Sequence, residues 1–200
     1  MFVYGCRFMS KPHRRGSVAT RRAILDSART AFVGSGYDGA GVREIAAGAG
    51  VTAMMVNRYF GSKETLFAEV VAEIMAGPRV LTDELMARDD AGLRLAQAVV
   101  DMTGRSATPL DGFLIMARSA SSPRAAEIAR VEIERHHQKT VAEALGGPDG
   151  ATRAALILSL VAGVQVMRQG LGLTALTEAD PEVLTGLLGR QFQDLIRPRP

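Results

Sequence analysis

Apolar residues recur at spacings of three and four along almost the whole chain, and this periodicity limits the fold more than any other feature of the sequence. In one early segment Ile24, Ala28, Ala31 and Phe32 form such a stripe. No sustained run alternates β-branched with polar residues, which is the pattern of a half-buried strand. At 200 residues the chain is long enough to bury a substantial core. The sequence therefore predicts an all-α protein.

Capping signals divide this pattern into separate helices. Ser62 precedes "KETLFAEVVAEIMA" as an N-cap, and Gly77 with Pro78 ends that segment. Asp180 and Pro181 begin the last helix in a similar way. Helices are therefore expected from residue 18 to the glycines of "GSGYDGAG", at "VREIAAGAG", at "VTAMMVNRYF", behind Ser62, and over about 79–88, 91–104, 109–119, 123–145, 151–171 and 181–196.

Charge is distributed unevenly, which points to a polyanionic partner. Residues 1–63 contain 10 Lys and Arg against 3 Asp and Glu, a net +7. Residues 64–200 contain 14 against 18, a net −4, so that the two parts sum to the +3 of the whole chain. A basic amino-terminal part on a mildly acidic remainder indicates that only the former meets nucleic acid. A merely solvated basic face is the alternative that charge alone leaves open.

The sequence argues against membrane and secreted proteins. The longest apolar run, "AALILSLVAGVQVM" at 154–167, lies between Arg153 and Arg168 and is shorter than the roughly 18 to 20 residues of a membrane span. The opening "MFVYGCRFM" lacks the apolar core and cleavage site of a signal peptide. The single cysteine, Cys6, has no partner for an internal disulfide. We therefore expect a cytoplasmic protein without a membrane partner.

Patterns for catalysis and for metal binding are missing from the sequence. It has no phosphate-cradling glycine loop, no nucleophile elbow and no carboxylate-rich metal spacing. His136 and His137 are adjacent, so they point about 100° apart on a helix and are poorly placed to share a metal ion. We expect no enzyme, no cofactor and no metal site.

Two short predicted helices, joined by Gly48, Ala49 and Gly50, have the spacing of a helix-turn-helix. On the second of them, steps of about 100° per residue place Val56 and Phe60 on one side, which we expect to be core. Arginine can bind guanine, asparagine can bind adenine, and methionine can contact the thymine methyl group. The side opposite the core carries such residues: Met54, Met55 and Arg58, with Asn57 on its flank. We therefore predict that this helix enters a groove of DNA.

The run "RRAILDSARTAFVGSGYDGAGVREIAAGAGVTAMMVNRYFGSKETLFAEVV" resembles the amino-terminal DNA-binding domain of the tetracycline-repressor (TetR-like) family of bacterial transcription regulators. The similarity covers about residues 18–71 and includes, in order, the first helix, "GYDG", "VREIA", "AGV", "RYF" and "SKETLF". It implies an all-α fold in which a three-helix DNA-binding domain with a helix-turn-helix is linked to a larger helical regulatory and dimerisation domain. On this basis we expect a flexible basic arm at 1–16, the DNA-binding domain at 17–63, and the ligand-binding and dimerisation domain at 64–200.

The resemblance also implies roles for individual residues. Arg43 matches a DNA-contacting position of the second helix, and Tyr59 and Lys63 match phosphate-contacting positions. Lys63 also begins a helix, where free amides favour an anion. Arg58 is left either as a phosphate clamp or as a base reader. The positions that match the base- and phosphate-facing side of the recognition helix are Thr52, Ala53, Met54, Met55 and Asn57.

Departures from the family pattern make the operator sequence non-transferable. Ala40 and Gly41 stand where a hydroxyl residue is common, so one phosphate contact is lost, although Gly41 can still cap the helix.

The basic arm leaves two interpretations open, because its cations either reach phosphates or a minor groove or act only at long range. Translation is expected to begin at Met1 or at Met9. The cations ahead of the first apolar stripe are Lys11, Arg14, Arg15, Arg21 and Arg22.

The carboxyl-terminal part is expected to form a homodimer and an effector pocket. Its last two long helices carry more apolar surface than a small bundle hides, and in the resembling family such helices pair with their twofold mates. The candidate interface residues are Leu156, Leu160, Leu184, Leu187, Leu188 and Phe192, and the candidate ligand contacts, on helices that surround the family's effector cavity, are Met102, Phe113, Met116 and Met167. For both sets the alternative is plain intrachain core.

Together these features predict a ligand-responsive transcriptional repressor. It binds a palindromic operator in double-stranded DNA as a homodimer and is released by a mainly apolar small molecule. Two other functions remain open: a DNA-binding regulator without an effector and, more distantly, an enzyme on a helical bundle. Selective DNA retention separates the enzyme from the regulators, and ligand-induced release separates the two regulators.

Overall fold

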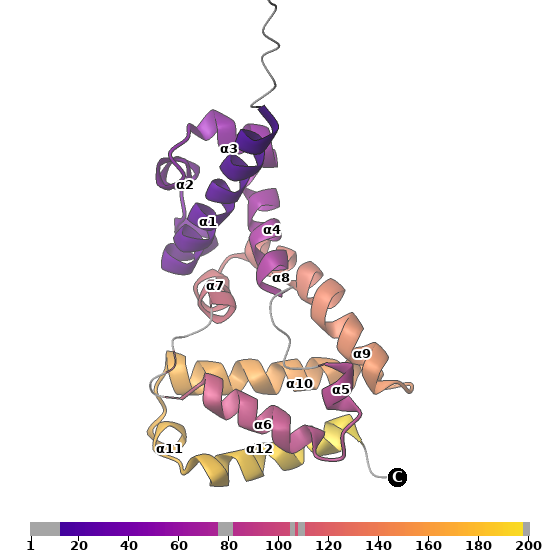
Figure 1. Cartoon of the computed structure of the whole chain (residues 1–200). Helices are drawn as coiled ribbons and strands as arrows, with labels where there is room; N and C mark the ends of the chain where they lie inside the picture. The colour runs from indigo at the N-terminus through magenta and orange to yellow at the C-terminus, as the bar shows by residue number, and fades with distance from the viewer. Residues whose placement is uncertain (1–12, 76–81, 105–106, 108–110, 198–200) are drawn as a thin grey trace, which may run out of the picture.

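The computed structural model describes residues 13–75, 82–104, 107 and 111–197, and within these ranges every regular element is helical. The predicted all-α class is confirmed. In chain order (Figure 1) the elements are α1 (His13–Gly39), α2 (Val42–Gly48), α3 (Ala53–Phe60), α4 (Lys63–Met75), α5 (Asp83–Met86), α6 (Ala91–Met102), α7 (Asp111–Ser119), α8 (Pro123–Ile133), the π-helical turn η1 (Glu134–Gln138), α9 (Lys139–Leu145), α10 (Gly150–Gln165), a second π-helical turn η2 (Val166–Gly170), α11 (Thr174–Thr177) and α12 (Pro181–Ile196).

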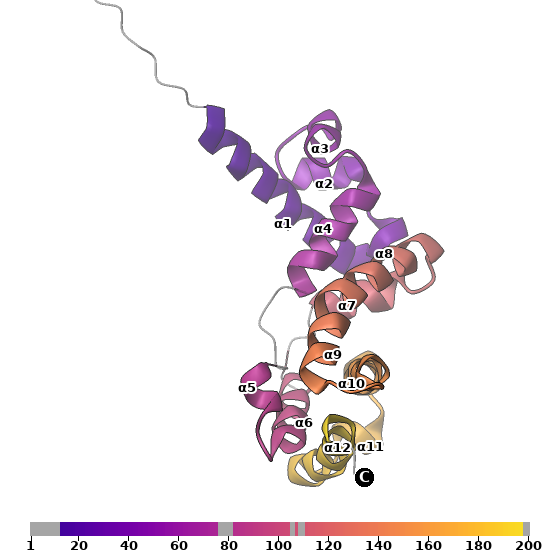
Figure 2. The same cartoon turned by 90° about the vertical axis from the view of Figure 1, so that its right-hand side faces the viewer.

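Two hydrophobic cores organise these helices. The first joins α1 to α4 with Ile115 of α7 and Ala125 of α8, and Phe32 and Phe67 are fully buried at its centre. The second joins α5, α6, α9, α10 and α12 around Phe192. Both views place α2 and α3 at one end of the molecule and α10 to α12 at the other, with α7 and α8 between them (Figures 1 and 2).

The first helix begins earlier than the sequence predicted. Helix α1 starts at His13, so residues 13–16, assigned above to a flexible arm, form its first turn. Arg21 and Arg22 lie inside the helix and form ion pairs with Glu69 and Glu73 of α4. The placement of these two arginines ahead of the first helix is therefore corrected, because both belong to α1 and their ion pairs join α1 to α4. Lys11 lies outside the described residues, and Arg14 and Arg15 fall in the first turn of α1.

Helix α4 belongs to the first core by packing. Its buried residues Leu66, Phe67, Val70 and Val71 all belong to that cluster. Ser62 caps the helix as predicted, since its hydroxyl accepts a hydrogen bond from the Thr65 amide at 3.1 Å. The domain boundary proposed after residue 63 therefore falls at the start of a helix that is built into the amino-terminal core.

Two of the long helices predicted beyond residue 120 are interrupted by a π-helical turn. Helices α8 and α9 are continuous through η1, and α10 continues through η2. Such turns insert one extra residue into a helix and occur frequently at functional sites. At η2, the guanidinium of Arg168 donates to the carbonyls of Val100 and Leu176 and to the Thr103 hydroxyl. Arg168 thereby ties the end of α6 to the one-turn helix α11, which the sequence analysis did not predict.

The remaining boundaries follow the capping chemistry. Asp180 caps α12 as predicted, because its carboxylate accepts hydrogen bonds from the amides of Glu182 at 2.7 Å and Val183 at 3.3 Å. Helix α5 is shorter than the segment expected at 79–88, of which residues 79–81 lie outside the described ranges. Helix α6 ends at Met102, two residues before the predicted end.

Candidate nucleic-acid interface

The turn between α2 and α3 is built on a glycine conformation. Gly50 has a φ of 66°, in the left-handed region that side chains with a Cβ disfavour. The chain then closes through a hydrogen bond from the Val51 amide to the Ala46 carbonyl at 2.9 Å. Thr52 caps α3, because its hydroxyl accepts from the Met55 amide at 3.4 Å. The turn and cap fix the direction in which α3 leaves the first core.

Helix α3 presents one face to the core and the other to solvent. Val56 and Phe60 are only 2% and 4% exposed, which confirms the predicted inner face. Met54 is 78% exposed, and Asn57 and Arg58 are exposed as well. Met55 is half-buried, so the outer face is narrower than the sequence analysis assumed. Figures 1 and 2 place α3 at the outer end of the molecule, away from α10 to α12.

The flanking candidates differ in exposure and in what holds them. Arg43 is exposed on α2, whereas Ala53 is half-buried against the first core. The Tyr59 hydroxyl donates to the Ser17 hydroxyl of α1 at 3.4 Å. The ammonium of Lys63 lies 4.6 Å from the centroid of the Tyr37 ring, where a cation is attracted to the face of the ring. Tyr59 and Lys63 are therefore held by contacts to α1.

Two of these supporting residues were missed by reasoning from sequence. Tyr37 stands in "GYDG", which marked only a turn, and its pairing with Lys63 spans 26 positions of the chain. Ser17 had no signal, because it lies ahead of the first apolar stripe and its contact with Tyr59 spans 42 positions of the chain. Gly41 begins α2 as expected, with its amide donating to the Glu44 carboxylate at 3.4 Å, while Ala40 is fully buried.

Comparison with known proteins resolves what this helix-turn-helix belongs to. Residues 24–70 match the family model described as bacterial regulatory proteins, tetR family, and residues 89–196 match that of the tetracyclin repressor-like C-terminal domain. The chain belongs to the tetR family of bacterial regulatory proteins. As a member of the tetR family it is a DNA-binding transcriptional regulator with an amino-terminal helix-turn-helix domain and a helical carboxyl-terminal domain.

Solved tetR-family structures share the fold over nearly the whole chain. A TetR-family regulator from Streptomyces coelicolor A3 is 25% identical with a TM-score of 0.55, covering 93% of this chain and 99% of that one. A transcriptional regulator from Rhodococcus sp. Rha1 is 26% identical with a TM-score of 0.58, covering 88% and 96%. NalD of Pseudomonas aeruginosa is 20% identical with a TM-score of 0.57, covering 87% and 96%. No curated protein matches the chain in sequence.

The candidate dimer residues fall into three groups by burial. Leu184 and Phe192 are 6% and 0% exposed, and Phe192 is the centre of the second core, so both are corrected to intrachain core residues. Leu160 and Leu188 are half-buried against the same core. Only Leu156 and Leu187, 47% and 51% exposed, offer free apolar surface. Further exposed apolar side chains on the same elements or next to them are Val166, Met167, Leu171, Leu173 and Val183.

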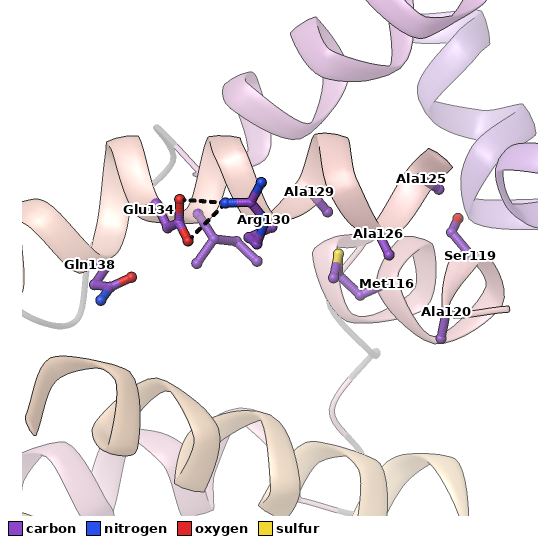
Figure 3. A pocket seen from close by; sticks show the side chains of 10 residues that line it. Met116, Ser119, Ala120, Ala125, Ala126, Ala129, Arg130, Glu134 and Gln138 are labelled. Atoms are coloured by element: carbon purple, nitrogen blue, oxygen red, sulfur yellow. Dashed lines mark hydrogen bonds and ion pairs between the residues drawn. The ribbon is translucent and has the colours of Figure 1, made fainter. Parts of the chain in front are cut away.

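The described surface has a hollow of about 390 Å³ between α7 and α8 (Figure 3). Of the four candidate ligand contacts only Met116 lines it, because Met102 and Phe113 lie elsewhere and Met167 is 41% exposed at the surface. Its walls are mostly small and apolar, with an Arg130–Glu134 ion pair at one end. The lining residues are Met116, Ser119, Ala120, Ala125, Ala126, Ala129, Arg130, Ile133, Glu134 and Gln138.

Among the described residues, no group of three or more His, Cys, Asp or Glu side chains comes together as a metal site. His136 is paired with Glu132, with 3.2 Å between Nε2 and the carboxylate.

Gly150–Gly170 is long and apolar enough to cross a membrane by length and composition, but core helices of soluble proteins share these two properties. Its one charge in α10, Arg153, is drawn inward to the carbonyls of Leu195 and Gly146.

Proposed function

We propose that this regulator is a repressor that binds a twofold-symmetric operator as a homodimer and is released by a mainly apolar small molecule. The observation that carries the proposal is the outward face of α3, where Met54 is 78% exposed beside the exposed Asn57 and Arg58. This face lies at the end of the molecule farthest from α10 and α12, which leaves it free to enter a groove (Figure 2).

The chemistry of that face suits direct reading of bases. Asn57 can bind adenine through two hydrogen bonds, and Met54 can contact the thymine methyl group, while Met55 adds a half-buried apolar contact. Arg58 reads guanine or clamps a phosphate. Tyr59 and Lys63 hold the helix in register on the phosphate backbone rather than read sequence. Arg43, Thr52 and Ala53 are the remaining candidate contacts to bases or phosphates.

A homodimer is supported by the uncharged outer face of α10. From residue 151 to 167 Arg153 is the only charged residue, and it is bonded inward, so the outward positions are apolar or small and include Leu156 and Val166. Leu187 and Val183 are further exposed apolar side chains, on α12. Exposed apolar side chains on both of the last two long helices favour a self-complementary interface about a twofold axis.

An effector is supported by the hollow between α7 and α8, whose volume and apolar lining suit a small ligand. NalD, one of the structural relatives, is itself described as the secondary repressor of a multidrug efflux pump. Release from DNA requires that the ligand bind one conformation more tightly than the other, and a coupling of about 1–3 kcal/mol weakens operator binding roughly 5- to 150-fold.

Selection from randomised duplexes in the presence of competitor DNA tests the DNA-binding part. The proposal expects a retained palindrome with half-sites about one helical turn, or 34–36 Å, apart. Retention of no sequence above the competitor contradicts it. Thermal-shift screening of apolar compounds, followed by titration of each binder into the protein–operator complex, tests release. Binders that never alter DNA affinity contradict the effector and leave a regulator without one.

A further inference from the structure

The hollow and the DNA-binding helices share contacts at one point of α1. Ser119, the last residue of α7, lines the hollow and is 4% exposed. Its hydroxyl accepts a hydrogen bond from the Tyr37 amide at 2.9 Å. Ser122 caps α8 at the other wall, and its hydroxyl donates to the carboxylate of Asp38, the residue after Tyr37, at 3.2 Å. The two helices that enclose the hollow are therefore fastened to two consecutive residues of α1.

Further contacts make α7 and the end of α1 move together. The Asp111 carboxylate at the start of α7 accepts from Arg29 Nε at 2.5 Å, and the Arg118 guanidinium donates to the Val33 carbonyl. At Gly36 the two backbones are so close that a Cβ would lie 2.4 Å from the Arg118 carbonyl oxygen. Leaving a buried amide without its acceptor is unfavourable, so Tyr37 follows Ser119 when α7 shifts.

The side chain of Tyr37 reaches the DNA-binding side of the same core. Its ring lies 4.9 Å from that of Phe67 in α4 and carries the Lys63 ammonium at 4.6 Å. Burial, with the nearby carboxylate of Glu64 beside Lys63, raises the pKa of the Tyr37 hydroxyl. A displacement of Tyr37 therefore changes where the lysine charge is held, at the first residue of α4 beside the end of α3.

We propose that Tyr37 couples the hollow to DNA: an occupant that separates α7 from α8 pulls on Tyr37 through Ser119 and draws the Lys63 ammonium away from its phosphate. This coupling rests on the proposed function, because it assigns a route to ligand-induced release. It deepens that proposal by naming one residue contact that is lost, and the loss has a distinct signature. A lysine withdrawn from phosphate lowers the salt dependence of binding, by about 0.9 in the slope of log affinity against log salt for each contact.

A side chain built into the hollow serves as the occupant in the test. Ala126 is exposed and lies on the α8 wall, facing the hollow beside Met116 (Figure 3). Ala126→Phe fills the space, and Ala120→Phe fills it from the end of α7 as a second variant if the first does not fold. Ala144→Phe is the matched control, because it adds the same side chain to an exposed site of α9 outside the hollow. Thermal unfolding verifies that each variant is folded.

The measurement is operator affinity at several salt concentrations, on the duplex selected by the wild-type protein. Ala126→Phe is expected to bind more weakly, with a salt slope lower by about 1.8 for a dimer, as Lys63→Ala does alone. The double variant Ala126→Phe/Lys63→Ala should bind the operator no more weakly than Lys63→Ala alone. Ala144→Phe should match the wild type in affinity and in salt slope. Weaker binding with an unchanged slope, or additive losses in the double variant, overturns the coupling. Absence of selective binding by the wild type overturns the proposed function instead.

A pair of Tyr37 variants tests the residue itself. Tyr37→Phe keeps the ring and the amide, so filling the hollow should still lower the salt slope. Tyr37→Leu removes the ring that carries Lys63, and Ala126→Phe in that background should leave the slope unchanged. A slope that still falls in the Tyr37→Leu background would show that the route does not pass through Tyr37.

Discussion

Gly36 offers the sharpest test of how α1 and α7 are joined. Its φ of 70° and ψ of −177° lie in a region that is essentially restricted to glycine, where another residue costs about 1–3 kcal/mol. An added Cβ would also lie 2.4 Å from the carbonyl oxygen of Arg118 and 2.8 Å from its carbonyl carbon. Both atoms are backbone, so no side-chain rotation relieves the overlap, and overpacking of this kind costs about 1–3 kcal/mol more.

We therefore expect Gly36→Ala to lower the free energy of unfolding by about 2–6 kcal/mol, adding the two costs. For a chain of this size about 1 kcal/mol corresponds to 2–4 °C in Tm. Gly34→Ala is the matched control two residues away. Gly34 has no atom within 4 Å of an added Cβ, so alanine there should stabilise the helix by about 0.5–1 kcal/mol.

Calorimetry of both variants at one protein concentration checks the prediction, since a dimer's Tm depends on concentration. The expected result is a Tm below that of the wild type for Gly36→Ala and a Tm at or above it for Gly34→Ala. If Gly36→Ala unfolds at the wild-type temperature, the close backbone contact between α1 and α7 is not present, and the coupling argued from it loses its basis.

Two other predictions concern the carboxyl-terminal helices. Leu187→Glu places a charge on the exposed apolar face of α12 and should yield monomers in sedimentation. Val18→Glu makes the same kind of change at an exposed residue of α1 and should stay dimeric. A Leu187→Glu variant that stays dimeric would show that this face of α12 is not part of the dimer interface. Arg168→Met removes the hydrogen bond that holds the Leu176 carbonyl, so the amides of α11 should exchange faster with deuterium, and unchanged exchange there would contradict the anchoring role of Arg168.

Local signals in the sequence predicted several helix starts and the inner face of α3 correctly. The caps at Ser62 and Asp180 and the inner face of α3 depend on residues within one or two turns, and capping and periodicity are properties of such short stretches. The exposure of Met54 follows from the burial of Val56, because the helical repeat points the two side chains to opposite sides of α3.

Contacts between distant segments were not predictable in the same way. Leu184 and Leu187 lie on one apolar stripe of α12, yet the first is buried and the second exposed, because α6 covers only part of that stripe through the close approach of Gly92 and Gly189. The pairing of Arg21 and Arg22 with Glu69 and Glu73 spans about 50 residues, so no local pattern predicts it. The π-helical turns left no mark in the apolar periodicity.

Binding-site selection with substituted proteins tests most directly whether α3 reads the operator. The variants are Met54→Ala, Met55→Ala and Asn57→Ala on α3, with Lys63→Ala for comparison, each at two salt concentrations. A good bidentate pair discriminates against the wrong base by about 1–3 kcal/mol, so Asn57→Ala should relax the preference at one position of each half-site. The methionine variants should lose preference for thymine with an unchanged salt slope, since a methyl contact releases no counterion.

Lys63→Ala should select the wild-type operator and bind every site more weakly, with the lower salt slope of a lost phosphate contact. That contrast between one altered base preference and a uniform loss is the result the account predicts. If the three α3 variants select the same operator as the wild type with the same stringency, α3 is not the helix that reads DNA.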